Sequence, residues 1–278
     1  MSSKSGDRSL ESSIAPVIAF DEGHNNFGHW VSSGVMEEFL SAEGFVVRQH
    51  LGAFTRESLD GIHILHISNA IAPENINKWS LPTPSAFTPE EIEVLYDWVN
   101  DGGSLLMVIE HMPIGGAFED LAGAFGIEVS NGFAVDERFL SGYSEEVILE
   151  AGLLVSRRTD GTLVDHPILD DTEPYGRIEF LAAHVGSAFR LPAHAFSLIT
   201  LGPTILSLEP EVSWEFDSGT ARRRVTGWSQ AGVIEVGKGR VAVLGDNFLF
   251  TWPEFLAPPY WESEKDAELG IHNMQFTL

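Results

Sequence analysis

A group of polar side chains that can bind metals or move protons follows the first apolar segment of the chain. Residues 16–20 read Pro-Val-Ile-Ala-Phe, which is the length and character of a buried strand. Two carboxylates, two imidazoles and two amides come next, at Asp21, Glu22, His24, His29, Asn25 and Asn26. Carboxylates and imidazoles together can hold a divalent cation or transfer protons. A hydrogen-bonded turn needs only one or two such residues, so we favour a functional site here.

Two later apolar segments end in the same kinds of side chain. Glu110 and His111 follow residues 104–109, where they could also cap a helix, and Asp246 follows residues 240–244. Because parallel strands present their carboxyl ends at one edge of a sheet, we expect these groups to line one crevice. The expected ligands of a Zn²⁺, Mn²⁺ or Fe²⁺ ion there are Asp21, His24, His111 and Asp246. The expected catalytic residues are Glu22, His24, Glu110 and His111, with one of the two glutamates as general base.

Amide, imidazole and aromatic side chains indicate how a substrate would be held. Loop residues Trp79, Trp252, Tyr260 and Trp261 suit stacking on sugar rings, although such rings also pack beneath loops. An Asp-His-Pro sequence at 165–167 is more often a structural corner than a binding element. No nucleotide cofactor is expected, because the chain has neither a glycine-rich fingerprint nor a P-loop. The expected substrate contacts are Asn25, Asn26, His166 and Trp252.

Apolar and amphipathic segments alternate in the first half of the chain, which predicts a doubly wound, mainly parallel α/β sheet. The expected strands are 16–20, 45–49, 62–68 and 104–109, and the expected helices are 31–42, 88–100 and 115–125. Thr88, Pro89 and the two acids that follow form a typical helix start. The insert 70–87 is long enough for a lid or binding loop.

The second half is richer in strand patterns and predicts a β-rich extension over about residues 160–245. Strands are expected at 178–189 and 195–208, with a hairpin-like pair formed by 214–226 and 232–244. A tight turn is expected at 237–239. Residues 1–13 are polar and serine-rich, which predicts a disordered leader before a single domain over 14–278.

The composition excludes several classes of function. With 41 acidic and 16 basic residues the net charge is −25, which disfavours nucleic acid and anionic membrane surfaces as partners. The absence of cysteine rules out thiolate zinc sites and a cysteine nucleophile. No apolar run approaches the ~18 residues of a membrane span. We expect a cytoplasmic protein, or a periplasmic one if a native signal peptide was removed, that binds a small molecule; its oligomeric state is open.

Several short motifs resemble the DUF4350-type proteins of the class I glutamine amidotransferase-like group, which have a flavodoxin-like α/β fold. These motifs are residues 20–27, the helix 88–103 leading into 104–111, the tetrad 165–168 and residues 239–246. The resemblance implies a fold and a site location, since the reactions of that family are largely uncharacterised. In amidotransferases of this fold the nucleophilic cysteine lies at a strand-to-helix turn, about where His111 lies here. A glutaminase needs an activated thiol, so none is expected.

Together these features predict an enzyme, a hydrolase or lyase, that acts on a small polar substrate such as a carbohydrate. A bound divalent cation would offset the crowded carboxylates Asp21, Glu22 and Glu110, since few Lys or Arg residues are near them. The alternative is a non-catalytic binding or scaffold domain that retains the fold, because fold does not decide function.

Overall fold

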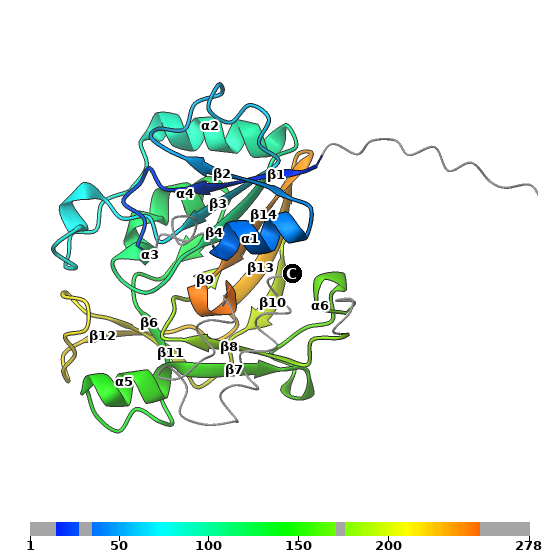
Figure 1. The fold of residues 1–278 in the computed structure, drawn as a ribbon. Helices are drawn as coiled ribbons and strands as arrows, with labels where there is room; N and C mark the ends of the chain where they lie inside the picture. The colour runs from blue at the N-terminus through cyan, green and yellow to red at the C-terminus, as the bar shows by residue number, and fades with distance from the viewer. Residues whose placement is uncertain (1–14, 28–34, 171–175, 251–278) are drawn as a thin grey trace, which may run out of the picture.

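A nine-stranded mixed sheet forms the centre of the protein in the computed structural model, which describes residues 15–27, 35–170 and 176–250 (Figure 1). Five neighbouring strands, in the order β2-β1-β3-β4-β14, are parallel, and β13, β9, β5 and β10 continue the sheet with antiparallel pairs. The nine strands are β1 (Val17–Asp21), β2 (Val46–His50), β3 (Ile64–Ser68), β4 (Ser104–Val108), β5 (Glu128–Val129), β9 (Phe189–Arg190), β10 (Phe196–Thr200), β13 (Ser229–Val236) and β14 (Gly239–Leu244).

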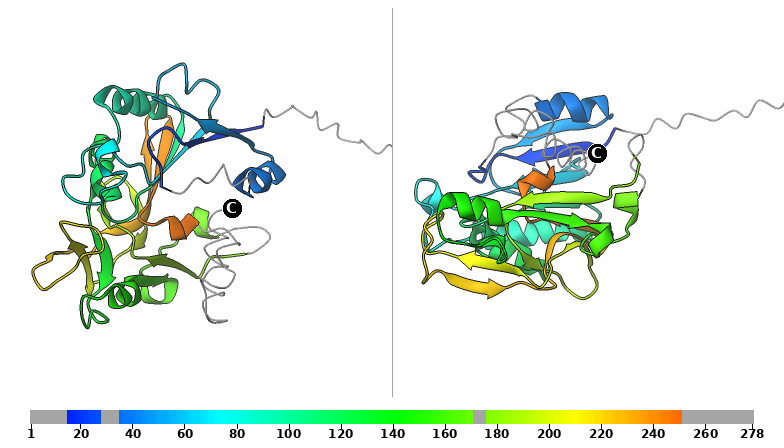
Figure 2. Two further views of the ribbon diagram at one scale, coloured as in Figure 1. Left: turned by 60° about the vertical axis from the view of Figure 1, so that its left-hand side comes forward. Right: turned by 90° about the horizontal axis from the view of Figure 1, so that it is seen from below.

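The parallel strands are almost continuously apolar because both faces of the sheet are covered. One face carries Ala19, Ile67 and Met107, which pack against Leu95 of α2 and Leu121 of α4. The other face carries side chains that pack with Leu40 of α1, among them Phe20, Val108 and Leu244. Figure 2 shows α1 and α2 on opposite sides of the sheet. The helices are α1 (Val35–Ala42), α2 (Pro89–Asn100), α3 (Ile114–Ala117) and α4 (Glu119–Ala124).

Two smaller sheets lie beside the main sheet (Figure 1). A three-stranded sheet has the order β12-β11-β6, and β7 pairs with β8. The helix α5 packs against β6, where Ile148 joins a core cluster with Phe133. These elements are β6 (Phe133–Asp136), α5 (Glu145–Gly152), β7 (Leu153–Arg157), β8 (Phe180–His184), β11 (Ile205–Glu209) and β12 (Ala221–Arg224), with α6 (Pro167–Asp170) and the 3₁₀ turns η1 (Pro73–Asn75), η2 (Arg158–Asp160) and η3 (Asn247–Phe250).

The expected start of α2 is confirmed in detail. Thr88 Oγ1 accepts the backbone N–H of Glu91, and the Glu91 carboxylate accepts the N–H of Thr88, which closes a capping box. The structure is a mixed α/β fold with a large, mainly parallel sheet, as the sequence predicts at that level. No helix among the described residues is long and apolar enough to cross a membrane.

Three predicted elements differ from the structure. The helix expected over 115–125 is two short helices that meet at Phe118. The strand expected over 195–208 is interrupted at Gly202-Pro203, where the chain leaves the main sheet as β10 and enters the small sheet as β11. The strand expected over 178–189 is likewise two, β8 and β9, separated by Val185 with its positive φ of 54°.

The hairpin-like pair expected between 214–226 and 232–244 is wrong. β12 pairs with β11 instead, while β13 turns at Gly237-Lys238 and pairs with β14. The positive φ of 58° at Gly237 is what this tight turn requires. β13 and β14 thus extend the main sheet, whereas β7, β8, β11 and β12 of the β-rich half belong to the two smaller sheets.

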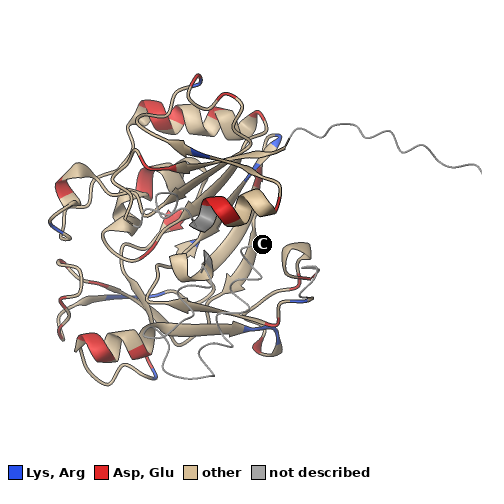
Figure 3. Cartoon of the chain, in the orientation of Figure 1, with Lys and Arg blue, Asp and Glu red and all other residues tan. Residues whose placement is uncertain are grey.

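Acidic residues occur in α1, α2 and α5, as the red segments of Figure 3 show. α1 and α2 begin with two glutamates each in the first turn, Glu37 and Glu38 in α1 and Glu90 and Glu91 in α2. Negative charge at a helix N-terminus is favourable, because it complements the helix dipole. Part of the large negative charge therefore stabilises the helices locally.

Because α2 lies very close to the start of β14, we expect a single added methyl group at Gly239 to lower the stability of the fold strongly. A Cβ at Gly239 would lie 2.1 Å from the Val99 carbonyl oxygen and 2.2 Å from that of Gly103. Both are backbone atoms that cannot move aside, so Gly239→Ala should lower the free energy of unfolding by about 2–3 kcal/mol. Gly202→Ala is the control, since its Cβ would meet no atom within 4 Å. Urea unfolding checks both, and equal stabilities of the two variants would contradict the packing.

Candidate functional site

The polar residues at the strand ends form two clusters on opposite faces of the sheet. Successive side chains of a strand point to opposite faces, and Ala19 packs on the α2 side whereas Phe20 packs on the α1 side. Asp21 therefore lies on the α2 side and Glu22 on the α1 side. By the same alternation Ile109 is on the α2 side, so Glu110 follows on the α1 side.

His24 is the centre of the cluster on the α2 side, where two carboxylates hold its ring. Its Nδ1 lies 2.9 Å from Asp21 Oδ1, and its Nε2 lies 3.0 Å from Glu91 Oε1. The ring is 8% exposed and stacks on Phe54, with 4.6 Å between ring centroids. Asn26 donates to Asp21 Oδ2 at 3.1 Å and so completes the cluster. Every polar atom of the His24 ring is thus engaged by protein.

The charges of this cluster stabilise one another. Burial would lower the pKa of His24, but the hydrogen bonds and negative charges of Asp21 and Glu91 outweigh it and raise the pKa above 6.5. Burial would raise the pKa of Glu91, but hydrogen bonds from Thr88 and His24 lower it more. An imidazolium between two carboxylates is a buried ion triad, in which removal of one partner leaves a buried charge without compensation.

The cluster on the α1 side contains two carboxyl groups with little to neutralise them. Glu110 is partly buried at the end of β4, and Asp246, 1% exposed, lies beyond the end of the neighbouring strand β14. Asn69 donates from Nδ2 to Glu110 Oε2 at 2.9 Å. Asp246 accepts the backbone N–H of His184 and, at 2.8 Å, that of Phe248. Among the described residues no Lys or Arg forms an ion pair with either carboxyl group.

Both of these carboxyl groups hold protons more tightly than usual. Burial raises the pKa of Glu110 to about 7, although hydrogen bonds from the Asn247 N–H and from Asn69 favour its charged form. Burial and then the negative charge of Glu110 raise the pKa of Asp246 well above its ordinary value. A carboxyl group that titrates near neutral pH can accept and return a proton in a reaction.

His111 lies apart from His24, in an aromatic pocket of the core. Its ring stacks on Phe133 with 4.3 Å between centroids and contacts Trp214 and Trp79 at 5.1 and 5.9 Å. Nδ1 donates to the Met112 carbonyl at 2.7 Å, and burial lowers the pKa of His111 to about 4. His111 is therefore neutral at pH 7. No contact joins it to His24 among the described residues.

The metal ligands expected from the sequence do not gather around one point. Asp21 and His24 bind each other on the α2 side, whereas Asp246 lies on the α1 side and His111 packs among aromatic rings. The residues that the structure describes contain no group of three or more His, Asp or Glu side chains placed to hold a cation. These four donors do not fit a shared metal ion.

Two of the expected substrate contacts do line a pocket. Asn25 and Asn26 border a pocket of about 370 Å³ together with Phe27, Trp79, Ile71 and Ile76. Phe27 and Trp79 meet edge to face at 5.2 Å, and both present aromatic surface to the pocket. The Phe27 N–H donates to the carbonyl of Asn69, whose side chain holds Glu110. The Phe27 backbone thus contacts Asn69, but the pocket itself is lined by Asn26 and Trp79 of the α2 side, and neither Glu110 nor Asp246 is among its lining residues.

The other expected contacts lie elsewhere. His166 sits at α6, where its Nδ1 accepts the Ile168 N–H at 3.3 Å and its ring lies 5.7 Å from that of Phe196. This agrees with the structural corner that its Asp-His-Pro sequence also allowed. Trp252, like His29, Tyr260 and Trp261, lies outside the described residues, as does the leader 1–13.

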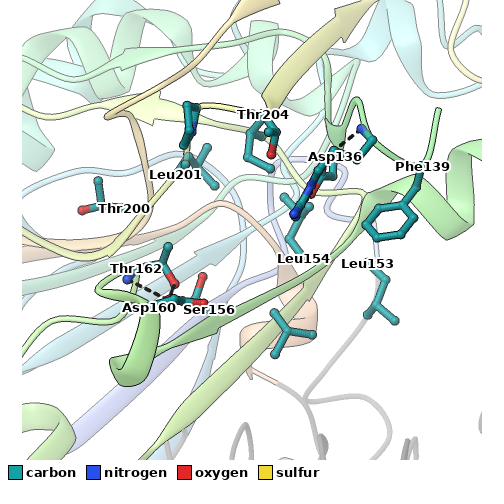
Figure 4. Close-up of a pocket in the computed structure, with 15 residues that line it drawn as sticks. Asp136, Phe139, Leu153, Leu154, Ser156, Asp160, Thr162, Thr200, Leu201 and Thr204 are labelled. Atoms are coloured by element: carbon teal, nitrogen blue, oxygen red, sulfur yellow. Dashed lines mark hydrogen bonds and ion pairs between the residues drawn. The ribbon is translucent and has the colours of Figure 1, made fainter.

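A larger pocket, of about 540 Å³, opens between β6, β7 and the connection from β10 to β11 (Figure 4). Its charged groups are already paired: Arg138 binds Asp136 at 3.0 Å, and Asp160 accepts the N–H of Thr162 at 3.0 Å. Its carboxylates are thus engaged by protein groups, so we do not place the general base there.

Asn69 and Glu91 are the residues that the sequence analysis missed. Asn69 directly follows an expected strand, so the reasoning that selected Glu110 would also have selected it. It is 0% exposed and has a positive φ of 50°, which Asn tolerates better than most residues. Glu91 was read as a helix cap only; its second role, with His24, depends on a partner 67 residues away.

Removal of the His24 ring should destabilise the protein, because Asp21 and Glu91 would be left buried without their counter-charge. We expect His24→Ala to lower the free energy of unfolding by about 3 kcal/mol at pH 6. The pKa of His24 is raised on folding, so this contribution is complete below pH 6.5 and is lost as the pH rises through the folded-state pKa. The deficit should therefore be smaller at pH 9. Denaturant unfolding measures it, with the exposed His194→Ala as control; a deficit independent of pH would refute the charged triad.

The buried carboxyl group of Glu110 should make the protein less stable as the pH rises. Its pKa is about 7 in the folded protein against 4.5 when unfolded, so the unfolded chain releases the proton first. Relative to Glu110→Gln, the native protein should lose about 1–3 kcal/mol of unfolding free energy between pH 4.5 and 8. Urea unfolding across that range tests this, with the exposed Glu93→Gln as control. Parallel curves for native protein and Glu110→Gln would show that Glu110 titrates normally.

Comparison with known proteins identifies a fold but no family. No family model and no curated protein matches the chain. The mmIFT52 N-terminal domain aligns with 83% of this chain and 86% of its own, at 15% identity and a TM-score of 0.51. The cytoplasmic protein STM1381 from Salmonella typhimurium LT2 covers 94% of this chain and 98% of its own (15% identity, TM-score 0.45). A putative ThuA-like protein from Bacteroides uniformis covers 95% and 93% (11% identity, TM-score 0.42). The first likeness shows a shared α/β fold and says nothing of function.

Proposed function

We propose that this protein is an enzyme that acts on a small polar substrate, a carbohydrate or related polyol, as a hydrolase or lyase with Glu110 as general base. The observation that carries the proposal is the Glu110–Asp246 carboxyl pair at the carboxyl ends of two adjacent parallel strands. Ligands of open α/β sheets bind outside these strand ends. Burying two carboxyl groups without a counter-charge destabilises the fold, and such groups concentrate at functional sites.

The pair makes Glu110 a stronger base than an ordinary carboxylate. Since burial raises the pKa of Glu110 to about 7, it is a base matched to neutral pH. Asn69 bonds to both the side chain and the backbone of Glu110, because its Oδ1 also accepts the Glu110 backbone N–H at 3.4 Å. A base that is held in place by a buried amide needs little reorganisation before it reacts.

The pocket lined by Asn25 and Asn26, at the same edge of the sheet but on its α2 side, is suited to a sugar-like substrate. Trp79 and Phe27 offer aromatic faces, and Asn25 and Asn26 bring amide groups to the same pocket. Aromatic surface with a few placed polar groups is the usual lining of a small-molecule site. The net charge of −25 supports a neutral substrate over a nucleic acid.

The mechanism needs no metal from the expected donors, because they do not converge. It also needs no thiol, which agrees with the expected lack of glutaminase activity. We further infer that the fold belongs to the doubly wound, class I glutamine amidotransferase-like group that the sequence motifs resemble. His111 would then occupy the turn that carries the nucleophile in the active amidotransferases, and here it serves as a packed core residue.

A panel of 4-nitrophenyl glycosides and sugar esters tests the proposal. For any member that is turned over, kcat should rise with pH through about 7, as Glu110 loses its proton. Glu110→Gln should reduce kcat at least ~100-fold, whereas Glu90→Gln, an exposed residue of α2, should leave it unchanged. Sugar binding without turnover of any panel member would instead establish a binding or scaffold domain.

A further inference from the structure

Two side-chain oxygens beside the carboxyl pair are buried and have no hydrogen-bond partner among the residues that the structure describes. They are Oε1 of Glu22 and Oγ of Ser68. Ser68 as a whole is 3% exposed. A buried polar atom without a partner keeps the full penalty of losing its water, so native proteins contain few of them. Two unpartnered oxygens at the ends of neighbouring strands therefore need an explanation.

The register of the sheet places Glu22 and Ser68 level with each other on neighbouring strands. Phe20 of β1 pairs with His66 of β3, so Glu22, two residues on, is level with Ser68. Both residues follow the side-chain alternation that puts Phe20 on the α1 side of the sheet. Ser68 is in turn level with Val108, and Glu110 lies two residues beyond it on the same side. The row Glu22, Ser68 and Glu110 thus runs along one face at the strand ends.

Backbone groups of both residues are already hydrogen-bonded, so the unpartnered atoms belong to the side chains. The Glu22 N–H donates to the His50 carbonyl at 3.0 Å, and the Ser68 carbonyl accepts Asn26 Nδ2 at 2.9 Å. Asn26 in turn donates to Asp21 of the ion triad. The triad on the α2 side is therefore linked through Asn26 to the end of β3. The two oxygens are thereby held in place with no partner from the described residues.

We propose that Glu22 and Ser68 form a subsite that binds hydroxyl groups of a neutral, polyhydroxylated substrate next to Glu110. This inference rests on the proposed function and names how the substrate is held. A carboxylate accepts hydrogen bonds, and a serine hydroxyl both donates and accepts. A sugar with adjacent hydroxyl groups can donate to Glu22 and exchange a hydrogen bond with Ser68.

A cationic ligand at this row would interfere with the proposed base, whereas a neutral one would not. A positive charge next to Glu110 would lower the pKa of that carboxyl group and weaken it as a base. A hydroxyl group can satisfy the same two oxygens without adding charge beside Glu110. A neutral sugar is therefore the ligand compatible with Glu110 as general base.

Titration calorimetry with D-glucose, D-galactose, D-mannose and D-xylose tests the subsite, with ethanolamine as the cationic comparison. Ser68→Ala and Glu22→Gln should each weaken binding of the best sugar about 5–20-fold. Ser68→Ala should leave the melting temperature of the free protein unchanged or higher, because it removes an unpartnered hydroxyl. Ser207→Ala is the matched control: Ser207 Oγ is also buried and unpartnered, but it lies in β11 of the small sheet. It should not change sugar binding.

The proposal is overturned if the native protein binds no sugar of the panel, if it binds only ethanolamine, or if Ser68→Ala and Glu22→Gln both bind as the native protein does. Its failure is distinct from failure of the proposed function. Glu110→Gln should still bind the sugar while it loses turnover. Weaker binding by Ser68→Ala, with turnover retained in Glu110→Gln, would keep the subsite and refute the general base.

Discussion

The ion triad of Asp21, His24 and Glu91 is the interaction on which the arrangement of the strand ends depends. It joins the end of β1 to the first turn of α2 and is buried at the edge of the core. Glu91 also caps α2 and accepts the Phe54 N–H at 3.0 Å, so three segments share one carboxylate. Because each charge is compensated only by the others, loss of one would leave a buried charge unpaired. The path of residues 22–27 follows from this triad.

The sheet separates two kinds of polar chemistry. On the α2 side one imidazole lies between two carboxylates, and the pKa values of His24 and Glu91 move in the directions that keep their opposite charges. On the α1 side no Lys or Arg of the described chain pairs with Glu110 or Asp246, and the pKa values of both carboxyl groups rise. The first arrangement adds stability, whereas the second lowers it in the ionised state. A fold retains such a destabilising pair most readily where the pair has a function, which is why the α1 side is the proposed reactive side.

Sequence reasoning succeeded where the signal is local. The apolar runs of β1, β3 and β4, the helix start at Thr88 and the turn at Gly237 were read from neighbouring residues. Sequence reasoning failed where a contact between residues distant in the sequence determines which strands pair. The segment 195–208 looked like one strand, because nothing local shows that its halves pair with different sheets. The same applies to 214–226, whose partner β11 was not the one expected.

The candidate site shows the same division. Residue types and their position after apolar runs were enough to select Glu22, Glu110 and Asp246, because parallel strands end at one edge whatever their order. Only the tertiary structure decided that Asp21 and His24 lie on the opposite face from Glu110. It also decided that His24 binds Glu91 and does not share a metal ion with His111, which packs on Phe133. The reason is physical: alternation along a strand assigns faces one residue at a time, whereas burial and charge pairing depend on helices and loops that are distant in the sequence.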